Sequence, residues 1–520
     1  MDYSDDDKKI LDYFFTNTDK SIFSTKNFHP EVWALMQARY SRSRLGLRES
    51  FLKLLKGDTH NFENLKKEIE KTKGGLEAQH ATEQAIQFME KWVLGFGHSS
   101  VAEGAVIGLG LEGVSILATK VIEDNRLCSY IEKSTRYVSF DNSTIYMDEK
   151  LKKSEFSEEI KELLDLLFQT YLELHEPVLE YVKKIAPMKE GMTEVAWTRA
   201  CEARRFDAIR YLLPACTKTS LGWTVNARQL VHAIVKLLSH PMKEMNEIGE
   251  QVKAEATKVL PSLLRFADRN YFMVKTNKEM TKLGDSIDVE DENQSPVTLV
   301  NAPANPDDTI LAAIMYRFKQ QSFAKVIAKI KSMTTKEKEE IFDTFLKNMG
   351  QFDYPMRELE HEQFTFEIVM DYGAFRDLQR HRICTQTNPL LTAELGYDIP
   401  QDIANSGVAD QYITAMDKVK EVYEKVVEKY PLEAQYLVPL GYKKRYLLTM
   451  NLRAIYHLVK LRTVPFAHES YRLIAYKVYD IMKEKYPLLS KYIICNYSKE
   501  ELGRLKSEEA TEKLETVGPL

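Results

Sequence analysis

Residues 214–238, PACTKTSLGWTVNARQLVHAIVKLL, are matched in the second half of the chain by residues 439–462, PLGYKKRYLLTMNLRAIYHLVKLR. In both stretches an asparagine lies 12 positions after the proline, and a histidine lies 6 positions after the asparagine. The matched residues are Pro214, Asn226, Arg228 and His232 in the first half and Pro439, Asn451, Arg453 and His457 in the second. Four residue types at identical spacing are improbable by coincidence, so the chain contains an internal duplication that predicts two similar folding units in tandem.

A set of polar residues is divided between the two halves. The first half carries RLCSYIEKSTRY at 126–137, and the second carries RHR at 380–382. Glu103 and Glu360 lie 23 and 22 residues before Arg126 and the last arginine of RHR, respectively. The two segments therefore occupy corresponding places in the two halves.

Length and composition describe an ordinary water-soluble protein of more than one domain. At 520 residues the chain exceeds a typical single core, and its polar tract at 277–308 reads as a linker. We therefore expect an N-terminal repeat at 1–285, with helical insertions, and a C-terminal repeat at 286–520. The net charge is −5 and no dense basic run occurs, so a nucleic-acid partner is not expected.

Cysteine use and hydropathy predict a cytoplasmic location. The five cysteines are scattered and form no C-x-x-C pair, which disfavours a disulfide framework or a zinc site. The acidic N-terminal segment lacks the basic flank and apolar run of a signal peptide. No stretch of about 20 uncharged apolar residues is present, so no membrane span is expected.

The periodicity of apolar residues predicts an α+β fold in which helices predominate. Strands are expected at 297–300 and 364–371, and a Gly-rich, less regular one at 105–115. Extra first-half length at 40–95 and 142–205 is expected to be mainly helical. Helical spacing of apolar residues is found at 158–184, 226–238, 244–266, 410–430, 451–462 and 468–486.

The divided polar residues are suited to binding a phosphorylated ligand. Guanidinium groups donate paired hydrogen bonds to phosphate oxygens, and a histidine can face a flat ring. Hydroxyl and carboxylate groups in one short loop can contact a sugar or a base edge. Taken alone, however, RHR also fits a solvated basic turn, and the serines and glutamate of 126–137 also fit a capped loop or helix start.

Together the two segments resemble a single signature, R-H-R-x-x-S-x-N-E-x-S-x-R-Y, which belongs to the flavin-dependent thymidylate synthases. The first half keeps its back part and departs at Asp124, Asn125 and Ile131. The second half keeps the front triplet and departs at Thr387, Asn388, Leu390, Thr392 and Ala393. The chain is similar in particular to tandem, double-length members of the family, which implies two synthase-like domains, each with a central and mostly antiparallel sheet.

Downstream positions show the same division. Arg210 matches the R-x-x-L-P segment whose arginine contacts the nucleotide in that family, whereas the second half has Gln435. Conversely, Arg462 matches a helical arginine assigned to ionising N3 of the pyrimidine, whereas the first half has Leu237. Because leucine has neither charge nor donors, each half lacks what the other keeps, and one composite site is predicted.

The resemblance implies a specific reaction: dUMP, methylenetetrahydrofolate and NADPH give dTMP, with FAD carrying the reducing equivalents. No metal is implied. The implied catalytic residues are Ser134, Arg136 and Arg462, and the implied substrate contacts are Glu132, Ser134, Arg136, Arg210, Arg380 and Arg462. The implied cofactor contacts are His98, Ser100, Glu103, Ser129, Arg380, His381, Arg382, Asn451, Arg453 and His457. Asn226 and Arg228 match flavin-contacting positions as well as Asn451 and Arg453 do, so the choice between these pairs stays open.

Two alternatives remain at the level of the sequence. One is a related flavoprotein that acts on another nucleotide or transfers another one-carbon unit, and the other is a flavin- or nucleotide-binding protein without catalysis. The family forms homotetramers, so a double-length chain is expected to form a homodimer with two competent sites. Dinucleotide-fingerprint, P-loop, zinc-protease and nucleophile-elbow motifs are absent from the sequence.

Overall fold

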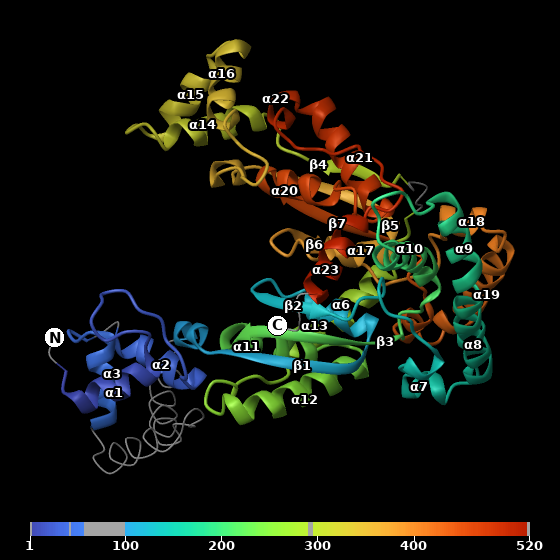
Figure 1. The fold of residues 1–520 in the computed structure, drawn as a ribbon, viewed down its shortest axis with the longest axis horizontal. Helices are drawn as coiled ribbons and strands as arrows, with labels where there is room; N and C mark the ends of the chain where they lie inside the picture. The colour runs from blue at the N-terminus through green and yellow to red at the C-terminus, as the bar shows by residue number, and fades with distance from the viewer. Residues whose placement is uncertain (1–2, 41–42, 57–98, 290–294, 517–520) are drawn as a thin grey trace. The chain divides into compact units, whose positions relative to one another are not determined.

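The computed structural model describes residues 3–40, 43–56, 99–289 and 295–516 (Figure 1). Its contacts define two compact units, each made of several chain segments. The first contains Met1–Glu112, Leu127–Glu132 and Ser220–Asp288, and the second contains Gly113–Arg126, Lys133–Thr219 and Val289–Leu520. The predicted boundary at 285/286 separates the two copies of the duplicated sequence and not the two compact units, so it stays a prediction.

The first sheet has three strands in the order β1–β3–β2. These strands are β1 (Val106–Ser115), β2 (Cys128–Glu132) and β3 (Lys218–Asn226). Strands β2 and β3 pair antiparallel, with Cys128 opposite Val225. Leu221, Trp223 and Val225 alternate with more exposed residues along β3 and are buried, as expected for a strand with one face against a core. The first unit also contains α1 (Asp5–Phe14), α2 (Pro30–Tyr40), α3 (Leu47–Lys56), η2 (Ser99–Gly104), α11 (Ala227–Leu238), α12 (Lys243–Val259) and α13 (Tyr271–Gly284).

The second sheet has four strands in the order β4–β5–β7–β6, and every neighbouring pair is antiparallel. The strands are β4 (Val297–Asn301), β5 (Gln363–Asp371), β6 (Thr385–Thr387) and β7 (Lys443–Asn451). Phe364, Phe366 and Ile368 are fully buried at every second position of β5. Helices α20 (Leu452–Arg462) and α21 (Glu469–Lys485) pack together, and they contact β7 and β5, respectively (Figure 1).

Corresponding strand-to-helix junctions have the same local design in the two repeats. Strand β1 leads into α6 (Ile116–Glu123) with Ser115 as N-cap, and β5 leads into α17 (Tyr372–Gln379) with Asp371 as N-cap. Asn226 caps α11 and Asn451 caps α20, each accepting a hydrogen bond from a backbone N–H of the first turn. Such caps satisfy donors that have no partner inside the helix, which explains the polar residue at each junction.

Within the second unit, the two proline segments that mark the duplication pair with each other. Pro214 and Pro439 form an antiparallel bridge. Ala215 N donates to Val438 O at 3.0 Å, and Leu440 N donates to Leu213 O at 2.9 Å. Ala215 corresponds to Leu440, and Val438 corresponds to Leu213, so the two bonds are equivalent. The two segments are therefore related by a local pseudo-twofold axis. This crossing brings residues just before Pro214 close to elements of the second repeat.

The remaining elements of the second unit are helical. The stretch 142–205, predicted to be a helical insertion, contains η3 (Asn142–Thr144), α7 (Glu149–Lys152), α8 (Ser157–Glu173), α9 (His175–Ile185) and most of α10 (Glu194–Ile209). The others are η4 (Arg210–Leu212), α14 (Pro306–Tyr316), α15 (Phe323–Lys331), α16 (Thr335–Leu346), η5 (Arg357–Glu360), α18 (Gln401–Asn405), α19 (Ala409–Val427), η6 (Glu433–Leu437), α22 (Pro487–Ser490) and α23 (Leu505–Thr516). Among the described residues, no helix is both long and apolar enough to span a bilayer.

The predicted α+β class and the antiparallel sheets are confirmed, with some corrections to individual elements. The predicted linker begins too early, because α13 extends to Gly284. The predicted helix at 158–184 is two helices that meet at Leu174. Residues 128–132, expected in a loop or helix start, form β2, because they pair with β3 along their whole length. Most of the predicted insertion at 40–95 lies outside the described residues.

Candidate functional site

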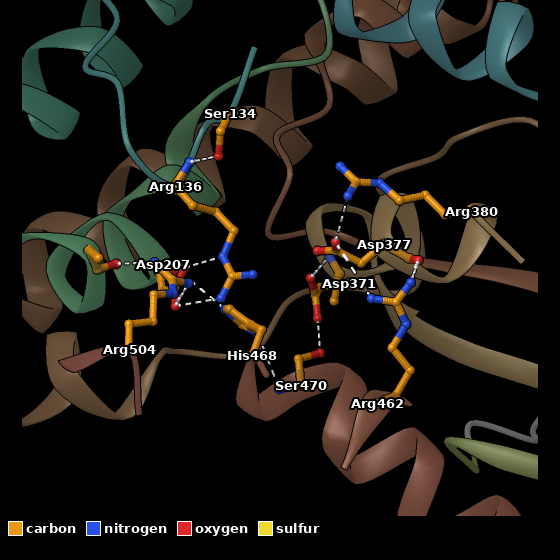
Figure 2. Close-up of polar contacts among 12 residues, drawn as sticks. Ser134, Arg136, Asp207, Asp371, Asp377, Arg380, Arg462, His468, Ser470 and Arg504 are labelled. Carbon is orange, nitrogen blue, oxygen red and sulfur yellow. Dashed lines mark hydrogen bonds and ion pairs between the residues drawn. The ribbon is translucent and has the colours of Figure 1, made fainter. Parts of the chain in front are cut away.

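Asp377, a buried carboxylate on α17, lies among arginines from both repeats (Figure 2). Burial by itself raises the pKa of this carboxyl group. Four guanidinium groups, those of Arg136, Arg210, Arg380 and Arg462, outweigh that effect and hold the pKa of Asp377 below the ordinary aspartate value. Arg380 Nη1 and Arg462 Nη1 lie 3.8 and 3.9 Å from Asp377 Oδ1. All five residues belong to the second compact unit.

Arg462 is held in place at the C-terminal end of α20. Its Nε donates to His381 Nε2 at 3.0 Å, and its Nη2 donates to the carbonyl oxygen of Asp377. His381 must be neutral to accept this bond, and burial followed by the charge of Arg462 lowers its pKa well below the ordinary histidine value. The His381 ring also lies 5.4 Å from that of His457. The result is a fixed guanidinium whose third nitrogen, Nη1, points into the cluster.

Arg136 forms a two-point ion pair with Asp207 on α10. Its Nε and Nη2 donate to the two carboxylate oxygens at 2.6 and 2.9 Å. Burial lowers the pKa of the Arg136 guanidinium, but the charge of Asp207 outweighs burial and raises it. The Ser134 hydroxyl accepts a hydrogen bond from Arg136 N at 3.2 Å. Among the described residues, Arg136 Nη1 has no hydrogen-bond partner, so one corner of the guanidinium is left for a ligand.

Arg210 is the most unusual member of the cluster. The residue is 2% exposed, yet its Nε and Nη2 are buried and have no hydrogen-bond partner among the described residues. Its guanidinium lies 5.8 Å from the Tyr211 ring, and its charge helps to lower the pKa of Asp377. A buried cation with unused donors is costly, because desolvation is not offset. An anionic ligand would supply the missing acceptors.

Two further side chains complete the surroundings of the cluster. His468 Nδ1 accepts a hydrogen bond from Ser470 N, and burial followed by the charge of Arg210 lowers the pKa of the His468 ring. The Ser470 hydroxyl donates to Asp371, the N-cap of α17. The whole cluster holds more arginines than carboxylates, namely Arg136, Arg210, Arg380, Arg462 and Arg504 against Asp207, Asp371 and Asp377. Its net positive charge favours an anion.

The structure thus brings together predicted residues from opposite halves of the chain. Arg136 and Arg210 come from the first half, and Arg380, His381 and Arg462 come from the second. Arg382 lies nearby on the same turn as His381, where its Nε donates to Arg126 O at 3.4 Å. The assignment of substrate and cofactor contacts to these residues stays a prediction.

Other predicted residues lie apart from this cluster. Arg453 pairs with Glu360 at 2.8 Å, and the corresponding Arg228 pairs with Glu103, so these glutamates and arginines hold equivalent places in the two repeats. Asn451 caps α20. Ser100 and Glu103 lie on η2, and Ser129 and Glu132 lie on β2, all in the first compact unit. His98 lies outside the described residues.

Sequence reasoning missed the acidic partners of the arginines. Asp377 lies three residues before Arg380, one helical turn away, and this spacing was a detectable signal. Asp371 has the weaker signal of an aspartate at a strand-to-helix junction. Asp207 and Arg504 carry no signal in the sequence, because each contacts the site across a long separation along the chain.

The fold and the cluster define the class of protein: an internally duplicated α+β protein with a buried arginine-rich cluster whose net positive charge favours an anion. Comparison with known proteins identifies the family. Residues 38–262 and 298–488 each match the family described as thymidylate synthase complementing protein, so both repeats are matched and the chain belongs to this family.

Relatives of two lengths are similar to this chain. A UPF0159 protein of Chlamydia muridarum is 33% identical over 526 residues, covering 98% of both chains. The flavin-dependent thymidylate synthase of Clostridium tetani is 23% identical over 193 residues, which is 36% of this chain and 74% of that one. A solved UMP/dUMP methylase, PolB from Streptomyces cacaoi with bound 5-Br dUMP, aligns with 15% identity and a TM-score of 0.31, covering 38% of this chain and 92% of that one.

Proposed function

We propose that this protein is a flavin-dependent thymidylate synthase. In this proposal it converts dUMP to dTMP, with methylenetetrahydrofolate as carbon donor, NADPH as reductant and FAD as cofactor. One composite site is built from both repeats. Membership of the thymidylate synthase complementing protein family and the names of the shorter relatives support the reaction class. The charge and geometry of the arginine cluster support the nucleotide as ligand.

The observation that carries the proposal is the buried, unsatisfied guanidinium of Arg210. A nucleoside monophosphate offers three strong acceptor oxygens and a negative charge, which match the unused Nε and Nη2 donors. Arg136 Nη1 adds a further donor, and Ser134, two residues earlier in the chain, accepts a hydrogen bond from Arg136 N. We assign Arg136 and Arg210 to the phosphate or sugar, and Ser134 and Glu132 to neighbouring ligand atoms.

Arg462 is suited to act on the pyrimidine. Two of its three nitrogens are fixed by His381 and by the Asp377 carbonyl, and Nη1 lies 3.9 Å from Asp377 Oδ1, so the guanidinium is oriented before a substrate binds. A fixed cation beside the base stabilises negative charge that develops on the ring and thereby increases the nucleophilicity of C5. Burial lowers the pKa of the Arg462 guanidinium and Asp377 acts in the opposite direction, and the group remains a cation that can donate a hydrogen bond to the base.

The second repeat also offers groups that fit a flavin cofactor. The side chain of Arg380 is 57% exposed and pairs with Asp377, and this exposure keeps donors accessible to a diphosphate. The rings of His381 and His457 lie 5.4 Å apart, inclined at 62°, and burial lowers the pKa of both, which favours uncharged rings beside a flavin. Arg453 uses Nε and Nη1 for Pro355 and Glu360, which leaves Nη2 for a ligand. We assign Arg380, His381, Arg382, Asn451, Arg453 and His457 to FAD; for His98, Ser100, Glu103 and Ser129 the cofactor role rests on the resemblance of the sequence alone. When bound, FAD would pass reducing equivalents from NADPH to the transferred carbon.

The test is dTMP formation by purified protein supplied with dUMP, FAD, NADPH and methylenetetrahydrofolate. Arg210→Ala and Arg380→Ala remove cations from opposite repeats; the first removes two donors that lack partners among the described residues, and the second removes an ion pair with Asp377. Each is expected to lower turnover by about 100-fold or more, as loss of a preorganised charge at a reacting centre does. Arg317→Ala is the matched control, since its side chain is 51% exposed and pairs with Glu358 away from the cluster.

Two results would contradict the proposal. Full activity in either cluster variant would exclude a composite site. A wild-type protein that binds FAD and is reduced by NADPH, but never forms dTMP, would favour another nucleotide substrate or a binding protein without catalysis.

A further inference from the structure

The C-terminal segment of the chain reaches the arginine cluster although it lies beyond both family matches, the second of which ends at residue 488. Arg504, just before α23, donates through Nη2 to Asp207 Oδ2, the oxygen that also accepts from Arg136 Nη2. Asp207 is therefore shared by an arginine of the family signature and an arginine from outside it (Figure 2).

Arg504 is held firmly in this position. Its side chain is 9% exposed, its Nη1 donates to Ala203 O at 3.4 Å, and its guanidinium lies 5.1 Å from the Tyr137 ring. Tyr137 directly follows Arg136, so Arg504 contacts both the partner and the chain neighbour of that arginine. A side chain in place of hydrogen at the preceding Gly503 would collide with the Pro465 carbonyl, so the chain passes close to the α20–α21 connection.

The segment around Arg504 is anchored to α10 and α21 by contacts outside the cluster. Arg204 Nη1 donates to Glu501 O at 2.7 Å, and Arg199 pairs with Glu515 at 3.0 Å. Arg472 Nη2 donates to Ser498 O. These contacts dock the segment independently of Arg504, so its guanidinium is not needed to hold the segment in place.

The charge of the shared group is the functional consequence. Arg136 and Asp207 alone form a neutral pair, and the carboxylate would repel an anion placed at Arg136 Nη1. Arg504 offsets that carboxylate, so the three groups together carry one net positive charge in a site of low exposure, where charge is weakly screened.

We propose that Arg504 is a positioning residue that keeps Arg136 available to the phosphate group of the nucleotide. The proposal rests on the function proposed above. Arg504 does not touch the ligand but acts through Asp207, by neutralising it and by fixing its carboxylate plane. The C-terminal segment, which lies beyond the second family match, thereby completes the phosphate side of the site.

The test compares calorimetric titrations of dUMP and of deoxyuridine, which lacks the phosphate, into wild type and three variants. Arg504→Gln is expected to weaken dUMP binding by about tenfold while deoxyuridine binding stays unchanged. Arg504→Lys keeps the charge and is expected to restore most of the dUMP affinity. Arg199→Gln removes only a docking contact of the same segment and is expected to bind both ligands as wild type does.

Three outcomes separate the possibilities. Equal dUMP affinity in Arg504→Gln and wild type overturns the proposal. Equal loss of dUMP and deoxyuridine overturns it as well, because that indicates a general structural role. If wild type binds neither ligand, the proposed function fails, and inorganic phosphate becomes the probe. In that case equal phosphate affinity of wild type and Arg504→Gln rejects the role of Arg504.

Discussion

Arg210 shows how a single residue can be held for a ligand at a cost to the fold. The side chain is almost fully buried, and two of its donors are unpaired. The corresponding residue of the second repeat, Gln435, is satisfied instead: its Oε1 accepts from Leu391 N at 3.1 Å, and its Nε2 donates to Leu432 O at 2.9 Å. At this position the first repeat thus has Arg210, with unpaired buried donors, and the second has Gln435, with both polar side-chain atoms hydrogen-bonded.

The variant Arg210→Gln converts the first position to the residue of the second. We expect its free energy of unfolding to rise by about 1–3 kcal/mol, because buried donors without acceptors are removed, a gain reduced by the loss of the attraction to Asp377. Its affinity for dUMP should fall strongly, since the donors for the phosphate are lost. Chemical denaturation and calorimetric titration measure the two effects on the same samples.

Arg136→Gln provides the comparison, because it breaks an existing ion pair with Asp207. This variant should lose stability as well as affinity. A loss of stability in Arg210→Gln similar to that in Arg136→Gln would show that Arg210 has a structural role and that its donors are not kept for a ligand.

The crossing of the two proline segments is the element on which the composite site depends. Besides the bonds between 213–215 and 438–440, Cys216 N donates to Tyr436 O, and Gly441 N donates to Tyr211 O at 2.9 Å. Cys216 corresponds to Gly441, and Tyr436 corresponds to Tyr211, so these two bonds are again equivalent in the two repeats. Because Arg210 directly precedes Tyr211, the crossing fixes the arginine of the first repeat against the second.

Gly441 permits the close approach at this crossing, so Gly441→Ala is the variant that tests it. A Cβ atom there would lie 2.8 Å from the Tyr412 hydroxyl and 3.0 Å from Tyr211 Cβ. We expect the free energy of unfolding to fall by about 1–3 kcal/mol through overpacking. Turnover should fall as well, because Arg210 moves with Tyr211.

Gly284→Ala is the control, since a Cβ at that residue of α13 meets nothing within 4 Å. Its stability should be unchanged or raised by up to about 1 kcal/mol, as alanine favours the helix. Similar losses in both variants, measured by thermal unfolding, would refute the role of the crossing.

Elements with a strong local signal were predictable from the sequence, and contacts between distant segments were not. The spacing from Pro214 to His232 indicated the duplication, and the regular apolar pattern of 364–371 indicated β5. Strand β3 was not predicted, although Leu221, Trp223 and Val225 recur with a period of two. The composite site was predicted because each half lacks motif residues that the other half keeps. The contact between Asp207 and Arg504 was not predicted, because it arises from tertiary packing and produces no periodic pattern in the sequence.

At the scale of the whole molecule, each repeat lacks charged residues that the other repeat has at the corresponding positions. At the positions that correspond to Asp377, Arg462 and Arg210, the other repeat has Val121, Leu237 and Gln435. A second site built from these residues would lack the charges that attract a phosphate and the guanidinium that acts on the base. We therefore predict a single nucleotide site per chain and two per homodimer.

Stoichiometry decides this prediction. Titration of dUMP should saturate at one equivalent per chain, and light scattering should give the mass of a dimer at the same concentration. Arg210→Gln sharpens the measurement: with one site per chain it should remove all detectable binding, because no second site remains. Saturation at two equivalents per chain, or survival of half of the binding in Arg210→Gln, would show that the degenerate position still binds nucleotide. Complete loss in this variant would show that all nucleotide binding by the chain depends on the Arg210 guanidinium, whose Nε and Nη2 have no hydrogen-bond partner among the described residues.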